Sequence, residues 1–145
     1  MKSNSYSELV CVTEAMYRSE AARMQALLVD ERRLRAELRQ IEEVRFAARD
    51  VPDSRLQGYR EIGADLTWQG WIGRSKANLH ADLARVLGRK GQVSNLLRRA
   101  YGKYLAATEL LQDQDRAYGQ RSMKQQHDLL EELGRLKRAQ ETAGD

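Results

Sequence analysis

A single proline, Pro52, divides this chain of 145 residues into two long segments that both carry a heptad pattern. Proline cannot donate the helical backbone hydrogen bond, and its ring clashes with the preceding turn, so a chain of long helices accommodates it only at a break. The sequence Asp50-Val51-Pro52-Asp53-Ser54 therefore marks the place where one helix ends. The sequence predicts a helical hairpin that turns at Pro52.

Apolar residues recur at alternating intervals of three and four in both segments, which is the a/d pattern of a coiled coil. Upstream of the proline the predicted seam is Tyr17, Met24, Leu27, Glu31, Leu34, Leu38, Ile41, Arg45 and Ala48. Downstream it is Ile72, Lys76, Leu79, Leu83, Val86, Lys90, Val93, Leu97, Ala100, Tyr104, Ala107, Leu111, Gln114 and Tyr118. A β-strand would need a period of two residues, which no stretch keeps for long. The predicted fold class is therefore all-α: a long two-helix antiparallel coiled-coil hairpin with a short helix at the turn and an overhanging C-terminal helix.

We expect one elongated coiled-coil domain over residues 1–145, because 32% of the residues are charged and only 6% are aromatic. Helix one is expected over about residues 6–49, with Ser5 or Ser7 as its N-cap. The turn and a short helix follow over about residues 50–65, where Asp65 is expected to cap the next helix. Helix two is expected over about residues 66–140.

Helix two is longer than helix one, so part of it is expected to lack an intramolecular partner. If the chain folds back at Pro52, helix one reaches only to about Leu105 or Thr108. After Tyr118 the apolar positions resume as Leu129, Leu133 and Leu136, shifted in phase by about one residue, as a stutter produces. We predict that Tyr118, Leu129, Leu133 and Leu136 belong to an overhang that meets a partner.

Catalytic chemistry finds little support in the sequence. His80 and His127 lie far apart on one predicted helix, and His127 with Glu131 at i, i+4 supplies only two metal ligands. Cys11 has no evident activating neighbour, so we expect a passive, partly buried thiol. We therefore predict no catalytic residue, no metal site and no cofactor.

Charge and hydropathy suggest a cytoplasmic chain. The formal net charge is +4, no apolar run follows the N-terminal lysine, and no stretch is long and apolar enough for a membrane helix. A single cysteine, Cys11, excludes an intrachain disulfide, which is compatible with a reducing compartment.

Trp68 and Trp71 stand beside helix-weakening glycines near the predicted tip of the hairpin. In one interpretation they pack against Val44, Phe46 and the short turn helix. In the other, at least one of them is an exposed anchor for a partner protein, a common role of tryptophan at interaction hot spots.

No acidic residue occurs between Leu83 and Thr108, and four cations, Arg85, Arg89, Arg99 and Lys103, fall on one flank of helix two. We call these four residues the basic flank. Acids of helix one, namely Glu14, Glu20 and Glu31, could neutralise it across the hairpin. Alternatively, the flank binds an acidic protein surface or a phosphate backbone.

The pattern as a whole resembles the FliJ family of flagellar export and its counterpart in virulence-type secretion, the YscO family. The resemblance lies in the seam from Met24 to Ala48, the turn region from Pro52 to Asp65, and Trp68-Gln69-Gly70-Trp71-Ile72 at the start of helix two. FliJ-like chains similarly place aromatic residues and glutamine there. Ser75 and Asn78, and the glycines of helix two, depart from the richer apolar pattern of that family.

The resemblance implies a non-enzymatic stalk at the cytoplasmic face of a secretion apparatus, similar to the central shaft of rotary ATPases. Its overhang would enter the hexameric export ATPase, and its flank and tip would meet the export-gate membrane protein. Export chaperones are further implied partners, and the chain would be a monomer or a weak homo-oligomer.

Two other function classes remain open. A coiled-coil scaffold or homodimer would self-associate through Leu129, Leu133 and Leu136, giving a concentration-dependent mass. A nucleic-acid binder would use the basic flank, and its affinity would fall steeply with salt.

Overall fold

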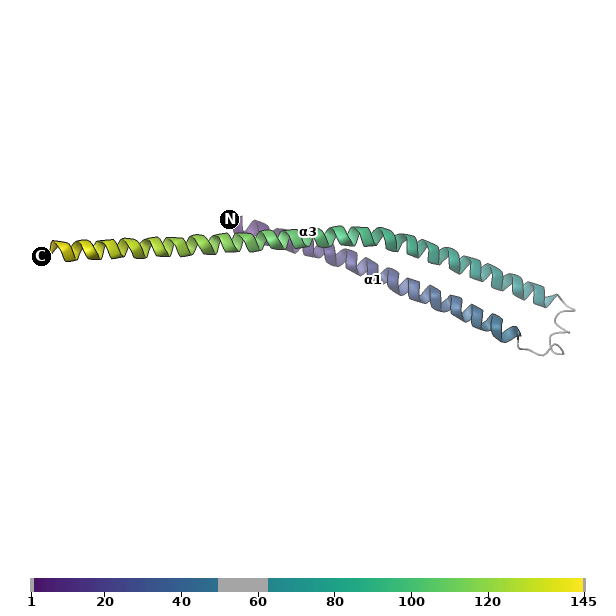
Figure 1. The fold of residues 1–145 in the computed structure, drawn as a ribbon. Helices are drawn as coiled ribbons and strands as arrows, with labels where there is room; N and C mark the ends of the chain where they lie inside the picture. The colour runs from purple at the N-terminus through teal and green to yellow at the C-terminus, as the bar shows by residue number, and fades with distance from the viewer. Residues whose placement is uncertain (1, 50–62, 145) are drawn as a thin grey trace. The chain divides into compact units, whose positions relative to one another are not determined.

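The computed structural model describes residues 2–49 and 63–144, which form two long helices and no strand (Figure 1). Helix α1 spans Lys2–Arg49, with 48 residues, and helix α3 spans Ala64–Ala143, with 80 residues. The predicted all-α helical hairpin is confirmed. The short helix expected at the turn falls on residues outside the described ranges, apart from Gly63.

Helix α1 begins earlier than predicted. Ser5 and Ser7 lie inside α1, so the prediction that one of them is the N-cap is wrong. The physical reason is that residues 2–49 contain neither proline nor glycine, and nothing in the first residues interrupts the helical backbone. Side-chain pairs one turn apart, such as Arg33 with Glu37 at 3.2 Å, add local support.

A glycine with a left-handed backbone conformation immediately precedes helix α3. Gly63 has a φ of 71°, a region that only glycine enters without strain. Its carbonyl accepts the backbone N–H of Thr67 at 3.2 Å and the Thr67 hydroxyl at 3.3 Å. The break predicted at Gly63 is confirmed, but Asp65 lies within the first turn of α3, so the prediction that Asp65 is the cap is wrong.

The chain divides into two compact units, and each contains a stretch of both helices. The first, which we call the hairpin unit, comprises Arg18–Arg99. The second, which we call the terminal unit, comprises Met1–Tyr17 together with Ala100–Asp145. The two units are described separately below.

In the hairpin unit the predicted seam is the contact surface. Leu34, Ile72 and Leu83 are buried, and the other predicted seam positions are partly covered. The partly covered positions are Met24, Leu27, Glu31, Leu38, Ile41, Ala48, Lys76, Leu79, Val86, Lys90, Val93 and Leu97. Arg45 is the exception: it is exposed, as expected of a long side chain whose charged end reaches water.

Among the described residues of the hairpin unit, two ion pairs cross the seam. The carboxylate of Glu31, whose side chain is only 13% exposed, accepts a hydrogen bond from Lys90 Nζ at 2.9 Å. Glu42, later in α1, pairs with Lys76, earlier in α3. This reversed order shows directly that the helices run antiparallel within this unit. Charged residues at seam positions specify register, because a shifted alignment leaves them without a partner.

Both carboxyl groups have pKa values below the ordinary value of 4.5. Hydrogen bonds from Lys90 and then Arg35 lower the pKa of Glu31, and the hydrogen bond from Lys76 lowers that of Glu42. Arg35 reaches Glu31 from the next turn of α1, at 2.9 and 3.0 Å. The ionised carboxylates are therefore the forms that the fold stabilises.

In the terminal unit the contact is partly aromatic. The ring of Tyr17 lies 5.2 Å from that of Tyr101 and 6.0 Å from that of Tyr104, measured between centroids. Such aromatic pairs add to the burial of apolar area. Ala100 and Ala107 are buried beside them, and their small side chains leave room for larger ones.

Pairing in the terminal unit extends further along α3 than predicted. Leu111 and Gln114 are still partly covered, whereas Tyr118 is 76% exposed. The predicted limit at Leu105 or Thr108 is therefore too early, because α1 begins at Lys2 rather than near residue 6. Tyr118, the last position of the predicted seam and the first of the predicted overhang residues, lies in the overhang, where α3 continues beyond the N-terminus of α1 (Figure 1).

The depressed pKa values predict acid-sensitive stability. Below pH 4.5 an unfolded chain binds more protons at Glu31 and Glu42 than the folded chain does, so their contribution is present at neutral pH and lost as the pH falls through their native pKa values. We expect the double variant Glu31→Gln with Glu42→Gln to have a lower free energy of unfolding at pH 7. Its free energy of unfolding is also expected to fall less steeply than that of the parent chain as the pH is lowered. Urea unfolding followed by circular dichroism from neutral to acidic pH measures this.

The matched control is Glu43→Gln with Glu109→Gln, two exposed carboxylates that have no ion pair with any described residue. Its pH profile is expected to parallel that of the parent chain. Equal flattening in both variants would contradict a specific role for the two cross-helix pairs.

Candidate functional site

Metal-ligand side chains do not cluster in the part of the chain that the structure describes. Within residues 2–49 and 63–144 no group of three or more His, Cys, Asp or Glu residues could hold a metal ion. His127 Nε2 instead contacts Glu131 at 3.2 Å as a local pair along α3. Cys11 is exposed, which corrects the expected partial burial. The candidate functional features of the described residues are surfaces.

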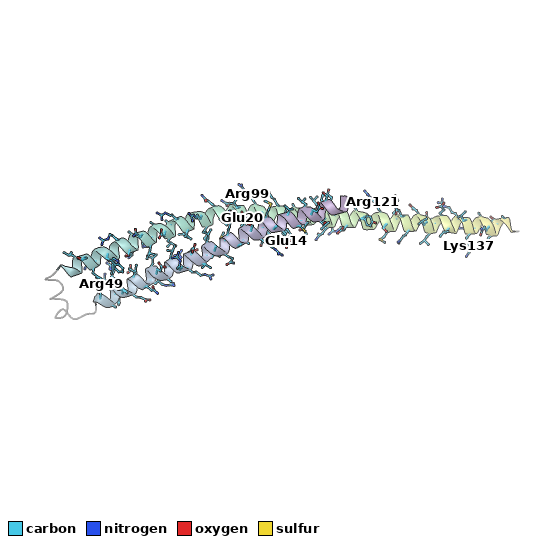
Figure 2. The ribbon with its side chains drawn as sticks, turned by 180° about the vertical axis from the view of Figure 1, so that it is seen from behind. Glu14, Glu20, Arg49, Arg99, Arg121 and Lys137 are labelled. Carbon is cyan, nitrogen blue, oxygen red and sulfur yellow. The ribbon has the colours of Figure 1, made fainter. Side chains whose placement is uncertain are left out.

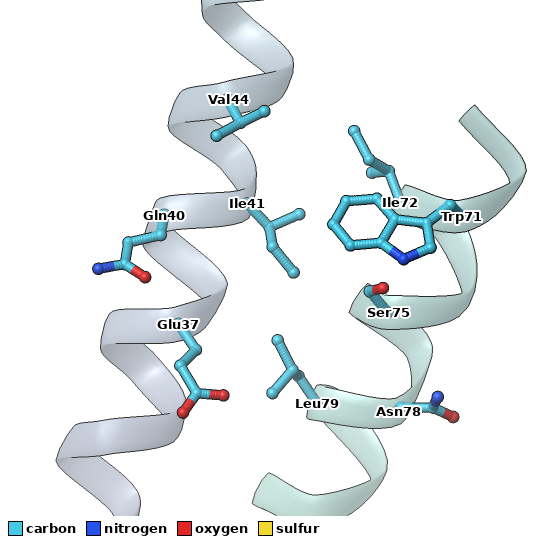
Figure 3. Close-up of a pocket in the computed structure, with 9 residues that line it drawn as sticks. All are labelled: Glu37, Gln40, Ile41, Val44, Trp71, Ile72, Ser75, Asn78 and Leu79. Carbon is cyan, nitrogen blue, oxygen red and sulfur yellow. The ribbon is translucent and has the colours of Figure 1, made fainter. Parts of the chain in front are cut away.

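An apolar groove lies between the two helices in the hairpin unit. It encloses about 530 Å³, and its apolar walls come from both helices (Figure 3). We call it the tip groove. Its lining residues are Glu37, Gln40, Ile41, Val44, Trp71, Ile72, Ser75, Asn78 and Leu79.

Trp71 forms the exposed wall of the tip groove. Its indole ring faces Ile41 and Val44 across the space between the helices (Figure 3). The adjacent Ile72 is 5% exposed, because it occupies the seam, whereas Trp71 lies beside the seam and is 53% exposed. Trp71 thus combines a half-packed ring with a free face, which suits a docking anchor.

The two tryptophans differ in exposure. Trp68 is partly covered, which fits packing, and Trp71 is half exposed, which fits an anchor. Val44 lines the groove with Trp71, but Phe46 is 67% exposed and does not enclose the groove. The residues expected to form the short turn helix lie outside the described ranges.

The polar residues of the tip groove give it an amphipathic character. Gln40 and Asn78 point away from the space between the helices, and Glu37 supplies one carboxylate (Figure 3). Arg33 already contacts Glu37 at 3.2 Å. The arrangement suits an amphipathic helix or an extended segment with one or two apolar anchors.

The basic flank is only slightly neutralised. Arg85 contacts Asp82 of the preceding turn at 2.7 Å, and both side chains are mostly exposed. Arg89, Arg99 and Lys103 form no ion pair with any residue in the described ranges. Lys103 belongs to the terminal unit, and the three arginines belong to the hairpin unit.

The acids expected to neutralise the flank have other partners. Glu31 pairs with Lys90 and Arg35. Glu20 contacts Arg23 of its own helix at 3.5 Å and forms no ion pair with Arg99. Figure 2 labels Glu20 and Arg99. Glu14 belongs to the terminal unit. Neutralisation across the hairpin is therefore not found for Arg89 and Arg99.

The overhang exposes its apolar residues. Leu129, Leu133 and Leu136 share one face of α3, and each is at least 58% exposed, as is Leu130 beside them. After Gln114, up to Gly144, no apolar side chain of α3 is buried. A single helix of this kind is marginal in water, so its exposed leucines suit a partner surface.

The tip groove was not predicted as such. Ile41, Ile72 and Leu79 were placed on the seam, and Trp71 was identified as a candidate anchor, but their convergence on one cavity depends on register. Val44 and Trp71 both lie next to seam residues in the sequence. This position beside the seam is the sequence feature from which the tip groove could have been inferred.

No protein-family model matches the chain, and comparisons with curated proteins and with solved structures give no match. Over the described ranges, neither helix has a stretch sufficiently long and apolar to span a membrane.

If Trp71 serves binding more than folding, its removal should cost less stability than removal of its neighbour. Ile72→Ala is expected to lower the free energy of unfolding by about 2–4 kcal/mol, because it empties a buried seam position. Trp71→Ala is expected to cost clearly less, since half of the side chain is already in water. Urea denaturation of both variants decides this; a larger loss from Trp71→Ala would make Trp71 a structural residue.

Proposed function

We propose that this chain is a non-enzymatic coiled-coil stalk or adaptor of a flagellar or type III protein export apparatus. It links the export ATPase ring to the export gate and promotes ATPase assembly and protein export. The observation that carries the proposal is the unpaired end of α3, which continues from Asp115 to Ala143 with its leucines exposed. At 1.5 Å per residue this segment is about 40 Å long.

The overhang has the properties that a shaft within a ring requires. A lone helix with its side chains is about 10–12 Å wide, so it suits a narrow axial channel. Charged residues such as Arg121, Asp128 and Lys137 are interleaved with the exposed leucines. This mixture allows contact with several ring subunits without one fixed apolar interface.

A second contact is assigned to the hairpin unit. In this proposal the tip groove, with Trp71 as anchor, receives a segment of the export-gate membrane protein at the cytoplasmic face. The absence of an apolar spanning helix in the described ranges is compatible with a peripheral position. Export chaperones are further candidate partners. The resemblance to FliJ and YscO chains in the seam, turn and Trp68–Ile72 region supports this assignment.

A homodimerising scaffold is the second candidate, and the exposed face of Leu129, Leu133 and Leu136 favours it. Two overhangs could bury these leucines against each other as a short coiled coil. Sedimentation equilibrium separates the candidates, because a scaffold requires a mass that rises with protein concentration.

The proposal predicts that the exposed leucines are needed to stimulate the export ATPase of the same organism. Leu129→Gln, Leu133→Gln and Leu136→Gln together keep helix propensity but remove the apolar face. We expect the concentration for half-maximal stimulation of ATP hydrolysis to rise at least tenfold, roughly the effect of losing one or two interface hot spots.

The control replaces two other exposed apolar residues, Val29→Gln with Leu66→Gln, which lie in the hairpin unit. It is expected to stimulate like the parent chain. If the parent chain neither binds the ATPase nor changes its rate or ring assembly, the stalk proposal fails and the scaffold becomes the better account.

A further inference from the structure

Arg85, Arg89, Gln92, Leu96 and Arg99 follow one another along a single face of α3 in the hairpin unit. Their spacings of three and four residues keep them within a narrow stripe on an α-helix. Arg89 and Arg99 are ten residues apart, which is about 15 Å along the helix axis. Leu96 lies between them and is 42% exposed. The stripe therefore has an apolar centre between two cationic ends.

Most of the positive charge on this stripe is not neutralised within the described ranges. Arg89 and Arg99 form no ion pair within the described ranges, and no acid occurs in α3 from Leu83 to Thr108. On α1, Arg33 contacts both Asp30, at 3.7 Å, and Glu37, at 3.2 Å. These two acids of the opposing helix are thus engaged by an arginine of their own helix, and Glu31 is engaged by Lys90 and Arg35.

The side-chain types on the stripe favour a protein partner over a nucleic acid. Arginine offers a planar donor fork that matches a carboxylate in two parallel hydrogen bonds. Leu96 would gain from contact with another apolar side chain, whereas a phosphate backbone offers it none. The modest net charge of +4, with acids and bases interleaved elsewhere, also gives little long-range attraction for a polyanion.

We propose that the stripe binds an acidic amphipathic helix of a partner protein, with carboxylates on Arg89 and Arg99 and an apolar side chain on Leu96. The partner's two carboxylates must lie about three helical turns apart on one face, with the apolar residue about two turns from one carboxylate and about one turn from the other. Arg85, held only by the exposed pair with Asp82, is available at the N-terminal edge of the stripe. The inference concerns a different surface from the overhang and does not depend on a role in export.

The test uses the full chain and a synthetic helical peptide as probe. The peptide carries two glutamates about three turns apart that flank a leucine on the same face. Its fluorescence anisotropy is measured with the parent chain and with Arg89→Gln combined with Arg99→Gln. Loss of two exposed charge pairs is expected to weaken binding about tenfold. Circular dichroism checks that the variant keeps its helix content.

A matched control removes the same charge from the same unit. Arg32 and Arg39 are exposed on α1 and form no ion pair within the described ranges. The combination Arg32→Gln with Arg39→Gln is expected to bind the peptide like the parent chain. If the two double variants weakened peptide binding equally, the effect would be explained by net charge alone, and the proposal would be overturned.

The variant Leu96→Gln distinguishes binding of a protein partner from binding of a nucleic acid. It is expected to weaken peptide binding several-fold and to leave any binding of a short DNA duplex unchanged. The proposal is overturned if the parent chain does not bind the acidic peptide. It is also overturned if the DNA duplex binds more tightly than the peptide and Leu96→Gln affects neither.

Discussion

The pairing of charged residues across the seam is the constraint on which the hairpin unit depends. Few side chains are fully buried there, so apolar area alone discriminates weakly between alignments related by one heptad. A shift of seven residues would place Glu31 opposite Leu83 or Leu97 instead of Lys90 and leave a mostly covered carboxylate without its cross-helix partner. The Glu42 pair with Lys76 imposes the same alignment closer to the turn.

This alignment of the two helices forms surfaces that are available for binding. It brings Trp71 opposite Ile41 and Val44, and so creates the tip groove. It also engages Glu31 with Lys90, a seam lysine, so that Glu31 is not available to Arg89 or Arg99. In the terminal unit the tyrosine cluster around Tyr17 marks a second zone of pairing, after which α3 continues alone. The molecule thus offers a groove, a cationic stripe and an exposed helix, all of which suit binding.

Much of the fold could be predicted because helix periodicity is a local property of the sequence. The seam residues, the break at Gly63 and the overhang all follow from spacing, glycine and segment length. The start of α1 could not be fixed by Ser5 or Ser7, because serine is tolerated within a helix as well as at its cap. The partners of Glu20 and Glu31, and the shape of the groove around Trp71, depend on register and rotamers, which no local pattern specifies.

The most direct test of this account exchanges the charges of the central pair and measures unfolding by urea at neutral pH. Glu31→Lys and Lys90→Glu each place like charges at one seam layer, so each is expected to lower the unfolding midpoint. The account predicts that the double exchange recovers most of that loss, because an attractive pair is restored in the same position. A double variant no more stable than the weaker single variant would contradict the claim that this pair fixes the alignment.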